Sequence, residues 1–168
     1  MIGGGNSTSS YGDVWSSSTG LTWNEQTLTN GFSARQGHAG VVFKNKMWVF
    51  GGYFINQGGG GTFLNDVYSS EDGATWTQES NNASWSGRYG HAAVVYDYKI
   101  LVMGGNNSSG DSKEVWYSTD GINWTQQTSS IVTWDAMKDF GAQVFDGKIW
   151  IIGGNPRTNK FYTFDGTT

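Results

Sequence analysis

Two histidines, His38 and His91, are the residues of this 168-residue chain best suited to bind a metal ion or to exchange a proton near neutral pH. They occupy the same place in two copies of one motif, Arg-x-Gly-His-Ala, which begins at Arg35 and again at Arg88. Equivalent residues of successive repeats lie in separate structural units, whereas the ligands of one zinc ion all lie about 2 Å from it. Phe140 fills the same place in the third copy. We therefore interpret the histidines as packing residues and predict no metal site and no other cofactor.

The arginines and most of the acidic residues also follow a repeat. Arg35 and Arg88 are equivalent, with Met137 in the third copy. Because a guanidinium group can satisfy several loop carbonyls at once, we interpret both arginines as structural. The absence of cysteine excludes disulfides, thiolate metal sites and cysteine nucleophiles.

Three polar residues do break the repeat, namely Asp135, Lys138 and Asp139, close to Trp134. A reaction centre needs unlike residues that meet at one place, so catalytic groups are expected to depart from a repeat. A hydrolase or lyase centred on these three residues is therefore one alternative for the function of this chain.

Four hydrophobic runs, each of which ends in a glycine pair, indicate the structural elements that must position these residues. The pairs are Gly3-Gly4, Gly51-Gly52, Gly104-Gly105 and Gly153-Gly154, and their first glycines are 48, 53 and 49 residues apart. Such a spacing predicts stacked supersecondary units of about 50 residues.

Each unit is predicted to contain two antiparallel hairpins. Alternating apolar residues from Ala39, the turn at 44–46 and the run ending at the glycine pair predict inner strands a and b. A third strand, c, carries an aromatic residue, and a tryptophan of strand d follows eight residues later in three copies: Trp15 and Trp23, Tyr68 and Trp76, Trp116 and Trp124. Between them lie tight turns, two of which contain Asp-Gly, and we expect the carboxylate to accept hydrogen bonds from its own turn backbone.

With its glycine pairs, strand-c aromatics and strand-d tryptophans, the chain resembles kelch repeats, and its Ser-x-Asp-Gly-x-x-Trp turns resemble Asp-box hairpins. The resemblance covers nearly the whole chain. It implies an all-β fold, a β-propeller built from four-stranded kelch-like blades, about three and a half of them. We expect a single propeller domain or fragment over residues 1–168, with units at approximately 1–30, 31–83, 84–132 and 133–168.

The first unit has no strand a and the last has no strand d, so the predicted ring cannot close by itself. Exposed apolar faces and unpaired strand edges promote association. We expect the chain either to be part of a longer polypeptide or to form a homodimer that completes a ring; a compact four-unit monomer is the competing geometry.

Recognition is expected on the face that carries the b-to-c and d-to-a loops, because variable loops on a rigid scaffold commonly bind partners. A long b-to-c connection is predicted from Tyr53 to Leu64, and Gly58 to Gly61 are predicted to form a flexible segment within it. The candidate binding residues on this face are Tyr53, Phe54, Asn56, Phe63, Trp85 and Trp134. Trp85 and Trp134 obey the repeat, so packing between units is the competing interpretation for both.

The leading hypothesis is a non-catalytic binding module that recognises a protein or a glycan; a purely structural segment of a larger surface protein is a third alternative. A net charge of -4 without a stripe of basic residues argues against nucleic acid as a partner. No stretch approaches the about 20 apolar residues of a membrane span. The sequence does not fix the cellular location. An extracellular or cell-surface setting is favoured by the abundance of Ser, Thr, Asn, Gly and Trp and by four Asn-x-Ser/Thr sequons.

Overall fold

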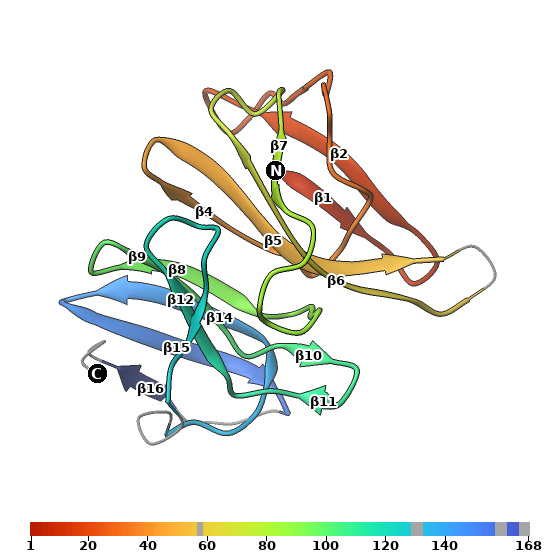
Figure 1. The fold of residues 1–168 in the computed structure, drawn as a ribbon. Helices are drawn as coiled ribbons and strands as arrows, with labels where there is room; N and C mark the ends of the chain where they lie inside the picture. The colour runs from red at the N-terminus through yellow and green to blue at the C-terminus, as the bar shows by residue number, and fades with distance from the viewer. Residues whose placement is uncertain (57–58, 129–132, 157–160, 165–168) are drawn as a thin grey trace.

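The computed structural model describes residues 1–56, 59–128, 133–156 and 161–164, and in these residues every regular element is a β-strand. Four antiparallel sheets follow one another along the chain and form the blades of a partial, unclosed propeller (Figure 1). The all-β prediction and the propeller architecture are confirmed. The described residues contain no helix that could cross a membrane.

The blades have the strand order a-b-c-d expected from the sequence. Blade 1 contains β1 (Ile2–Gly5), β2 (Ser10–Ser16) and β3 (Asn24–Glu25), and blade 2 contains β4 (Ala39–Phe43), β5 (Lys46–Ile55), β6 (Gly61–Ser70) and β7 (Thr77–Ser80). Blade 3 contains β8 (Ala92–Tyr96), β9 (Lys99–Met103), β12 (Val115–Ser118) and β13 (Thr125–Gln126), and blade 4 contains β14 (Lys138–Phe145), β15 (Lys148–Asn155) and β16 (Phe161–Phe164). A small hairpin, β10 (Asn106–Asn107) and β11 (Gly110–Asp111), projects from blade 3.

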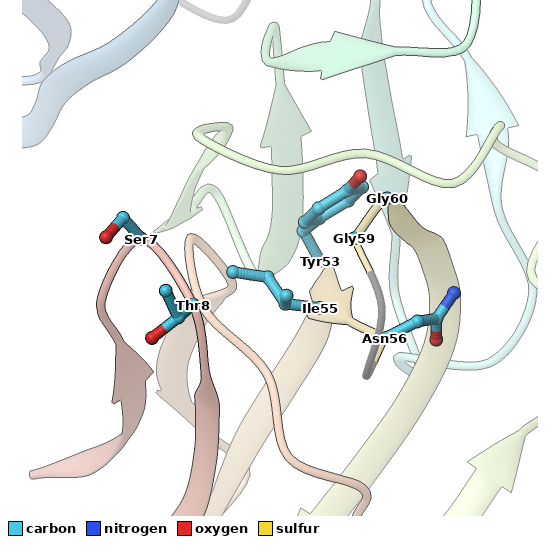
Figure 2. Close-up of a pocket in the computed structure, with 7 residues that line it drawn as sticks. All are labelled: Ser7, Thr8, Tyr53, Ile55, Asn56, Gly59 and Gly60. Atoms are coloured by element: carbon cyan, nitrogen blue, oxygen red, sulfur yellow. The ribbon is translucent and has the colours of Figure 1, made fainter.

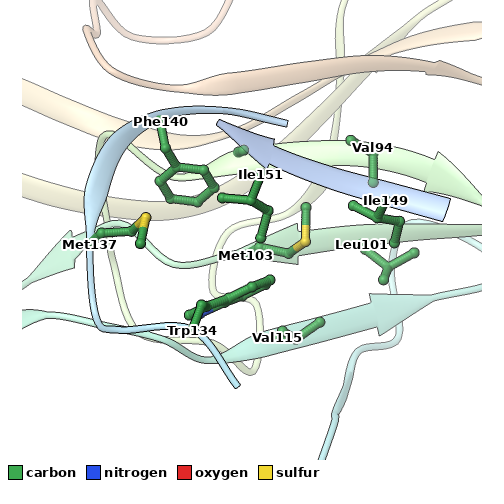
Figure 3. Close-up of a cluster of buried hydrophobic side chains, with 10 residues drawn as sticks. Val94, Leu101, Met103, Val115, Trp134, Met137, Phe140, Ile149 and Ile151 are labelled. Carbon is green, nitrogen blue, oxygen red and sulfur yellow. The ribbon is translucent and has the colours of Figure 1, made fainter. Parts of the chain in front are cut away.

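The hydrophobic core is divided among the joints between blades, because each sheet buries its apolar side chains against its neighbours. One cluster joins blades 1 and 2 around Val14 and Val49, and a second joins blades 2 and 3 around Phe50 and Val102. The third cluster, shown in Figure 3, joins blades 3 and 4. Every blade therefore depends on the blade next to it.

The glycine pairs connect the blades through their backbones. The amide of the second glycine donates to the carbonyl of the next blade's motif: Gly4 to Arg35, Gly52 to Arg88 and Gly105 to Met137, at 2.8 to 2.9 Å. The first glycine of the blade 2 pair, Gly51, has a φ of 53°, and a Cβ atom there would lie 2.7 Å from the carbonyl oxygen of Leu64. Glycine is needed here both for the left-handed backbone and for the close approach of strand β6 of the same blade.

The b-to-c connection of blade 2 differs from the sequence-based prediction. Tyr53 to Ile55 and Gly61 to Leu64 belong to strands β5 and β6, which pair beyond the glycine pair as far as Ile55 and Gly61. Most of the connection predicted from Tyr53 to Leu64 is therefore paired strand. Cross-strand aromatic packing between Tyr53 and Phe63 stabilises this extended hairpin.

Candidate functional site

The two repeated arginines are buried in the scaffold. Arg35 donates two hydrogen bonds to the carboxylate of Asp66, at 2.6 and 2.9 Å, and a third at 2.8 Å to the carbonyl of Gly51. Arg88 repeats this arrangement with Glu114 and Gly104. Each guanidinium group thereby donates to the carbonyl of the first glycine of the pair in its own blade, as the structural interpretation predicted.

The two histidines lie in adjacent blades, where His91 is buried and His38 is half-buried. Burial, followed by the nearby Arg35 charge, lowers the pKa of His38 to about 4. Burial, with smaller effects of Arg88 and His38, lowers the pKa of His91 to about 3. Both rings are therefore neutral at physiological pH. Among the described residues, no group of three or more His, Asp or Glu side chains is placed to hold a metal ion.

We predict that this pair makes the fold sensitive to acid. An unfolded histidine binds a proton below about pH 6.5, whereas the folded protein resists protonation until its lower pKa values, so stability is lost as the pH falls from about 6.5 toward 4. The cost is about 2 kcal/mol per histidine near pH 4.5. The measurement is urea unfolding as a function of pH, with His91→Phe as control, because Phe140 occupies this place in blade 4. An equal slope in the variant would contradict the assignment.

The acidic turn residues bond to their own hairpins. The carboxylate of Asp120 accepts hydrogen bonds from the amides of Ile122 and Asn123, both at 2.8 Å, and Asp72 accepts the equivalent pair. Backbone donors to Asp72 lower the pKa of this carboxyl to about 2. The carboxylates are thus acceptors within their turns, in the role expected from the sequence. The corresponding turn at the chain's end lies outside the described residues.

The face that carries the b-to-c and d-to-a connections, here called the loop face, presents three aromatic rings from two blades. Tyr53 and Phe63 stand opposite each other on β5 and β6, with ring centroids 5.1 Å apart. Tyr89, from the connection that precedes β8, lies 5.4 Å from Tyr53 and 5.8 Å from Phe63. All three are partly exposed. We call these residues the aromatic cluster.

Blade 4 adds a cation to this cluster. The Lys138 ammonium group lies 5.1 Å from the ring centre of Tyr89 and donates a 3.0 Å hydrogen bond to its hydroxyl. This hydrogen bond is the largest cause of the raised pKa of Lys138. The amine is therefore cationic at neutral pH, which suits binding rather than nucleophilic or base catalysis.

A cavity of about 450 Å³ lies beside the aromatic cluster, between the β1–β2 turn and the β5–β6 hairpin (Figure 2). Its lining residues are Ser7, Thr8, Tyr53, Ile55, Asn56, Gly59 and Gly60. Ser10 holds the two hairpins together, because its hydroxyl donates to the Tyr53 carbonyl and accepts from the Ile55 amide. Tyr53 thus belongs to both the cavity and the cluster.

The candidates named from the sequence fall into four groups. Tyr53 and Phe63 meet in the aromatic cluster, and Asn56 lines the cavity. Phe54 is partly buried and alternates with Tyr53 and Ile55 along β5, so it lies on the other side of the hairpin.

The two tryptophan candidates are buried between blades. Trp85 belongs to the cluster that joins blades 2 and 3, and Trp134 belongs to the cluster that joins blades 3 and 4. Packing between blades accounts for both side chains and leaves neither ring on the surface.

The proposed catalytic trio has separate partners. The carboxylate of Asp135 accepts a hydrogen bond from Tyr162, while Lys138 bonds to Tyr89. Asp139 is exposed, and its backbone amide donates to the carbonyl of Gly90 in the neighbouring blade. Asp139 therefore links blade 4 to blade 3, and Lys138 supplies a cation on the loop face.

Sequence reasoning did not single out Tyr89 as a binding residue. Tyr89 occupies the variable position of the Arg-x-Gly motif, where the other copies have Gln36 and Lys138. This position lies on the loop face in all three blades, because its backbone pairs with the extension of strand b: Gln36 with Tyr53, Tyr89 with Asn106 and Lys138 with Asn155. The sequence did contain a signal for this binding position, because three different residues occupy it in the three copies of the motif.

Comparison with known proteins identifies relatives of this scaffold. The KLHDC2/KLHL20/DRC7 Kelch-repeats domain matches residues 1–168. A Rho GTPase-activating protein, gacHH of Dictyostelium discoideum, is 32% identical over 111 residues, which cover 58% of this chain. The matched region is 6% of that much longer protein.

Proposed function

Because the chain belongs to the kelch-repeat family, whose domains mediate protein interactions, we propose that its loop face is a non-catalytic surface that binds a segment of a protein partner. The observation that carries the proposal is the aromatic cluster with Lys138, which draws on three blades and departs from the repeat.

The cluster has the properties of an interface centre. Aromatic side chains lose little conformational entropy on binding and bury a large area, so they are enriched among the residues that dominate binding energy. Mutual packing holds Tyr53, Phe63 and Tyr89 in place before a partner arrives. Preorganised rings of this kind reduce the entropic cost of association.

The cavity offers the cluster a polar neighbour. Ser7 and Thr8 contribute hydroxyl groups and Asn56 an amide, each able to hydrogen-bond with a peptide. An apolar anchor beside a few convergent polar groups is the usual composition of a specific binding site. A partner segment that crosses from the cavity to Lys138 would contact blades 1, 2, 3 and 4.

We expect Tyr89→Ala to weaken peptide binding about 30-fold or more, since it removes the ring shared by the cluster and Lys138. The probe is a library of random short peptides displayed on phage and selected against the 168-residue protein. Affinities of the selected peptides are then measured by calorimetry for the wild type and the variant.

Tyr98→Ala is the matched control, because Tyr98 is an exposed tyrosine in the β8–β9 turn, outside the cluster. Its affinities should equal those of the wild type. Failure to enrich any peptide, equal loss in both variants, or selective binding to a glycan array would contradict the proposed function.

A further inference from the structure

The loop-face connections of blades 1 and 2 contain almost no charged residues. The two b-to-c connections are residues 6–9 and 53–64, and the two d-to-a connections are residues 26–38 and 81–91. In the sequence of all four, Arg35 and Arg88 are the only residues among Asp, Glu, Lys and Arg. Both arginines are 0% exposed and are paired with carboxylates. Neither charge can therefore meet a partner.

The cavity beside the aromatic cluster shares this neutrality. Figure 2 shows Thr8 on the first hairpin and Ile55 on the second, and none of the described residues that line the cavity is charged. Among the described residues, no hydrogen bond engages the side chain of Ser7 or that of Asn56. The Thr8 hydroxyl donates to the Asn6 side chain and can still accept a hydrogen bond. The cavity thus offers hydroxyl and amide groups but no counter-ion.

The cation of the loop face lies at the other side of the cluster. Lys138 contacts the cluster through Tyr89, whereas the cavity contacts it through Tyr53. The hydrogen bond to Tyr89 is the largest cause of the raised pKa of Lys138, and the charges of Asp111 and Asp139 raise it further. These two carboxylates partly balance the ammonium charge, so Lys138 does not require an acidic residue from a partner.

A charged side chain in the cavity would lose water without gaining an ion of opposite charge. This desolvation is costly, and hydroxyl or amide groups compensate it only in part. Neutral side chains such as Ser, Thr, Asn and Gln, and the peptide backbone itself, can be satisfied by neutral donors and acceptors. The apolar surfaces of Tyr53 and Ile55 add contact area for either kind of residue.

Building on the proposed function, we propose that the cavity rejects charge of either sign in the bound peptide. The segment that lies between the two hairpins carries only uncharged side chains, with hydroxyl, amide or small apolar groups. A charged residue is accepted only in the part of the peptide that extends toward blades 3 and 4. Specificity at this site therefore comes from the exclusion of charged segments as well as from the contacts with the accepted one.

The test starts from a peptide that is selected on the wild-type protein and that loses affinity in Tyr89→Ala. Each peptide position is replaced in turn by Gln, Glu, Met and Lys, and the affinities are measured by calorimetry. At one stretch of positions, we expect Glu to bind about tenfold or more weakly than Gln, and Lys about tenfold or more weakly than Met. The members of each pair are close in size, so the difference reports the charge.

Variants of the protein then locate this stretch at the cavity. Thr8→Lys should restore binding of the Glu-substituted peptides, and Thr8→Glu that of the Lys-substituted peptides, because each variant supplies a counter-ion. Ser109→Lys and Ser109→Glu are the matched controls, since Ser109 is exposed in the β10–β11 turn and does not line the cavity. Neither control should restore binding.

Three results would overturn the inference while the proposed function stands. A peptide that depends on Tyr89 could tolerate Glu or Lys at every position, its sensitive stretch could be unaffected by both Thr8 variants, or the Ser109 controls could restore binding as well as the Thr8 variants do. Failure to select any peptide that depends on Tyr89 would overturn the proposed function and the charge exclusion together.

Discussion

Arg35→Met is expected to destabilise the protein by about 3 to 5 kcal/mol, as measured by urea unfolding. The substitution removes the guanidinium group but leaves the Asp66 carboxylate buried, and the Gly51 carbonyl loses a donor. The size of the residue is not the reason, because Met137 occupies this place in blade 4. The cost comes from the unpaired charge.

A second substitution separates charge from packing. Adding Asp66→Asn to Arg35→Met removes the uncompensated charge, so the double variant should be more stable than Arg35→Met alone. If the double variant were less stable than the single one by the full cost of Asp66→Asn in the wild type, the two residues would be energetically independent and the structural role of the ion pair would be wrong.

Trp85→Ala is expected to lower the free energy of unfolding by about 3 to 5 kcal/mol, because core packing is lost. The ring is buried between blades 2 and 3, edge-on to Trp124 and in contact range of Gly51. Its loss opens a cavity at a joint that two blades share. The urea midpoint should fall in Trp85→Ala and remain near that of the wild type in Tyr98→Ala, whose side chain is exposed. An unchanged midpoint in Trp85→Ala would return this residue to the binding candidates.

The repeat made most of the scaffold predictable. Strand order and the local hydrogen bonds of the Asp72 and Asp120 turns follow from residues that recur at fixed spacing. Recurrence also identified Arg35 and Arg88 as structural. These features depend on contacts within a blade or on contacts that every joint repeats, so several copies of the motif specify each of them.

The loop face was less predictable because its contacts occur once. Tyr89 reaches Tyr53 and Phe63 only because the angle between blades 2 and 3 brings the connection before β8 to the β5–β6 hairpin. That angle is set by side-chain packing throughout the joint, which spacing along the sequence does not encode. The extension of the β5–β6 hairpin and the small β10–β11 hairpin both follow a glycine pair, but their lengths depend on local pairing that differs between blades.

The division between repeated scaffold and non-repeated binding surface can be tested on two neighbouring residues. The free energy of unfolding and the affinity for a selected peptide should be measured together for Arg88→Met and Tyr89→Ala. We expect Arg88→Met to lower the free energy of unfolding, because Glu114 and Gly104 lose their partner, while the protein that remains folded binds the peptide normally. Tyr89→Ala should lose the peptide with a much smaller loss of stability. The reverse pattern, or equal effects of both substitutions on both quantities, would contradict the account.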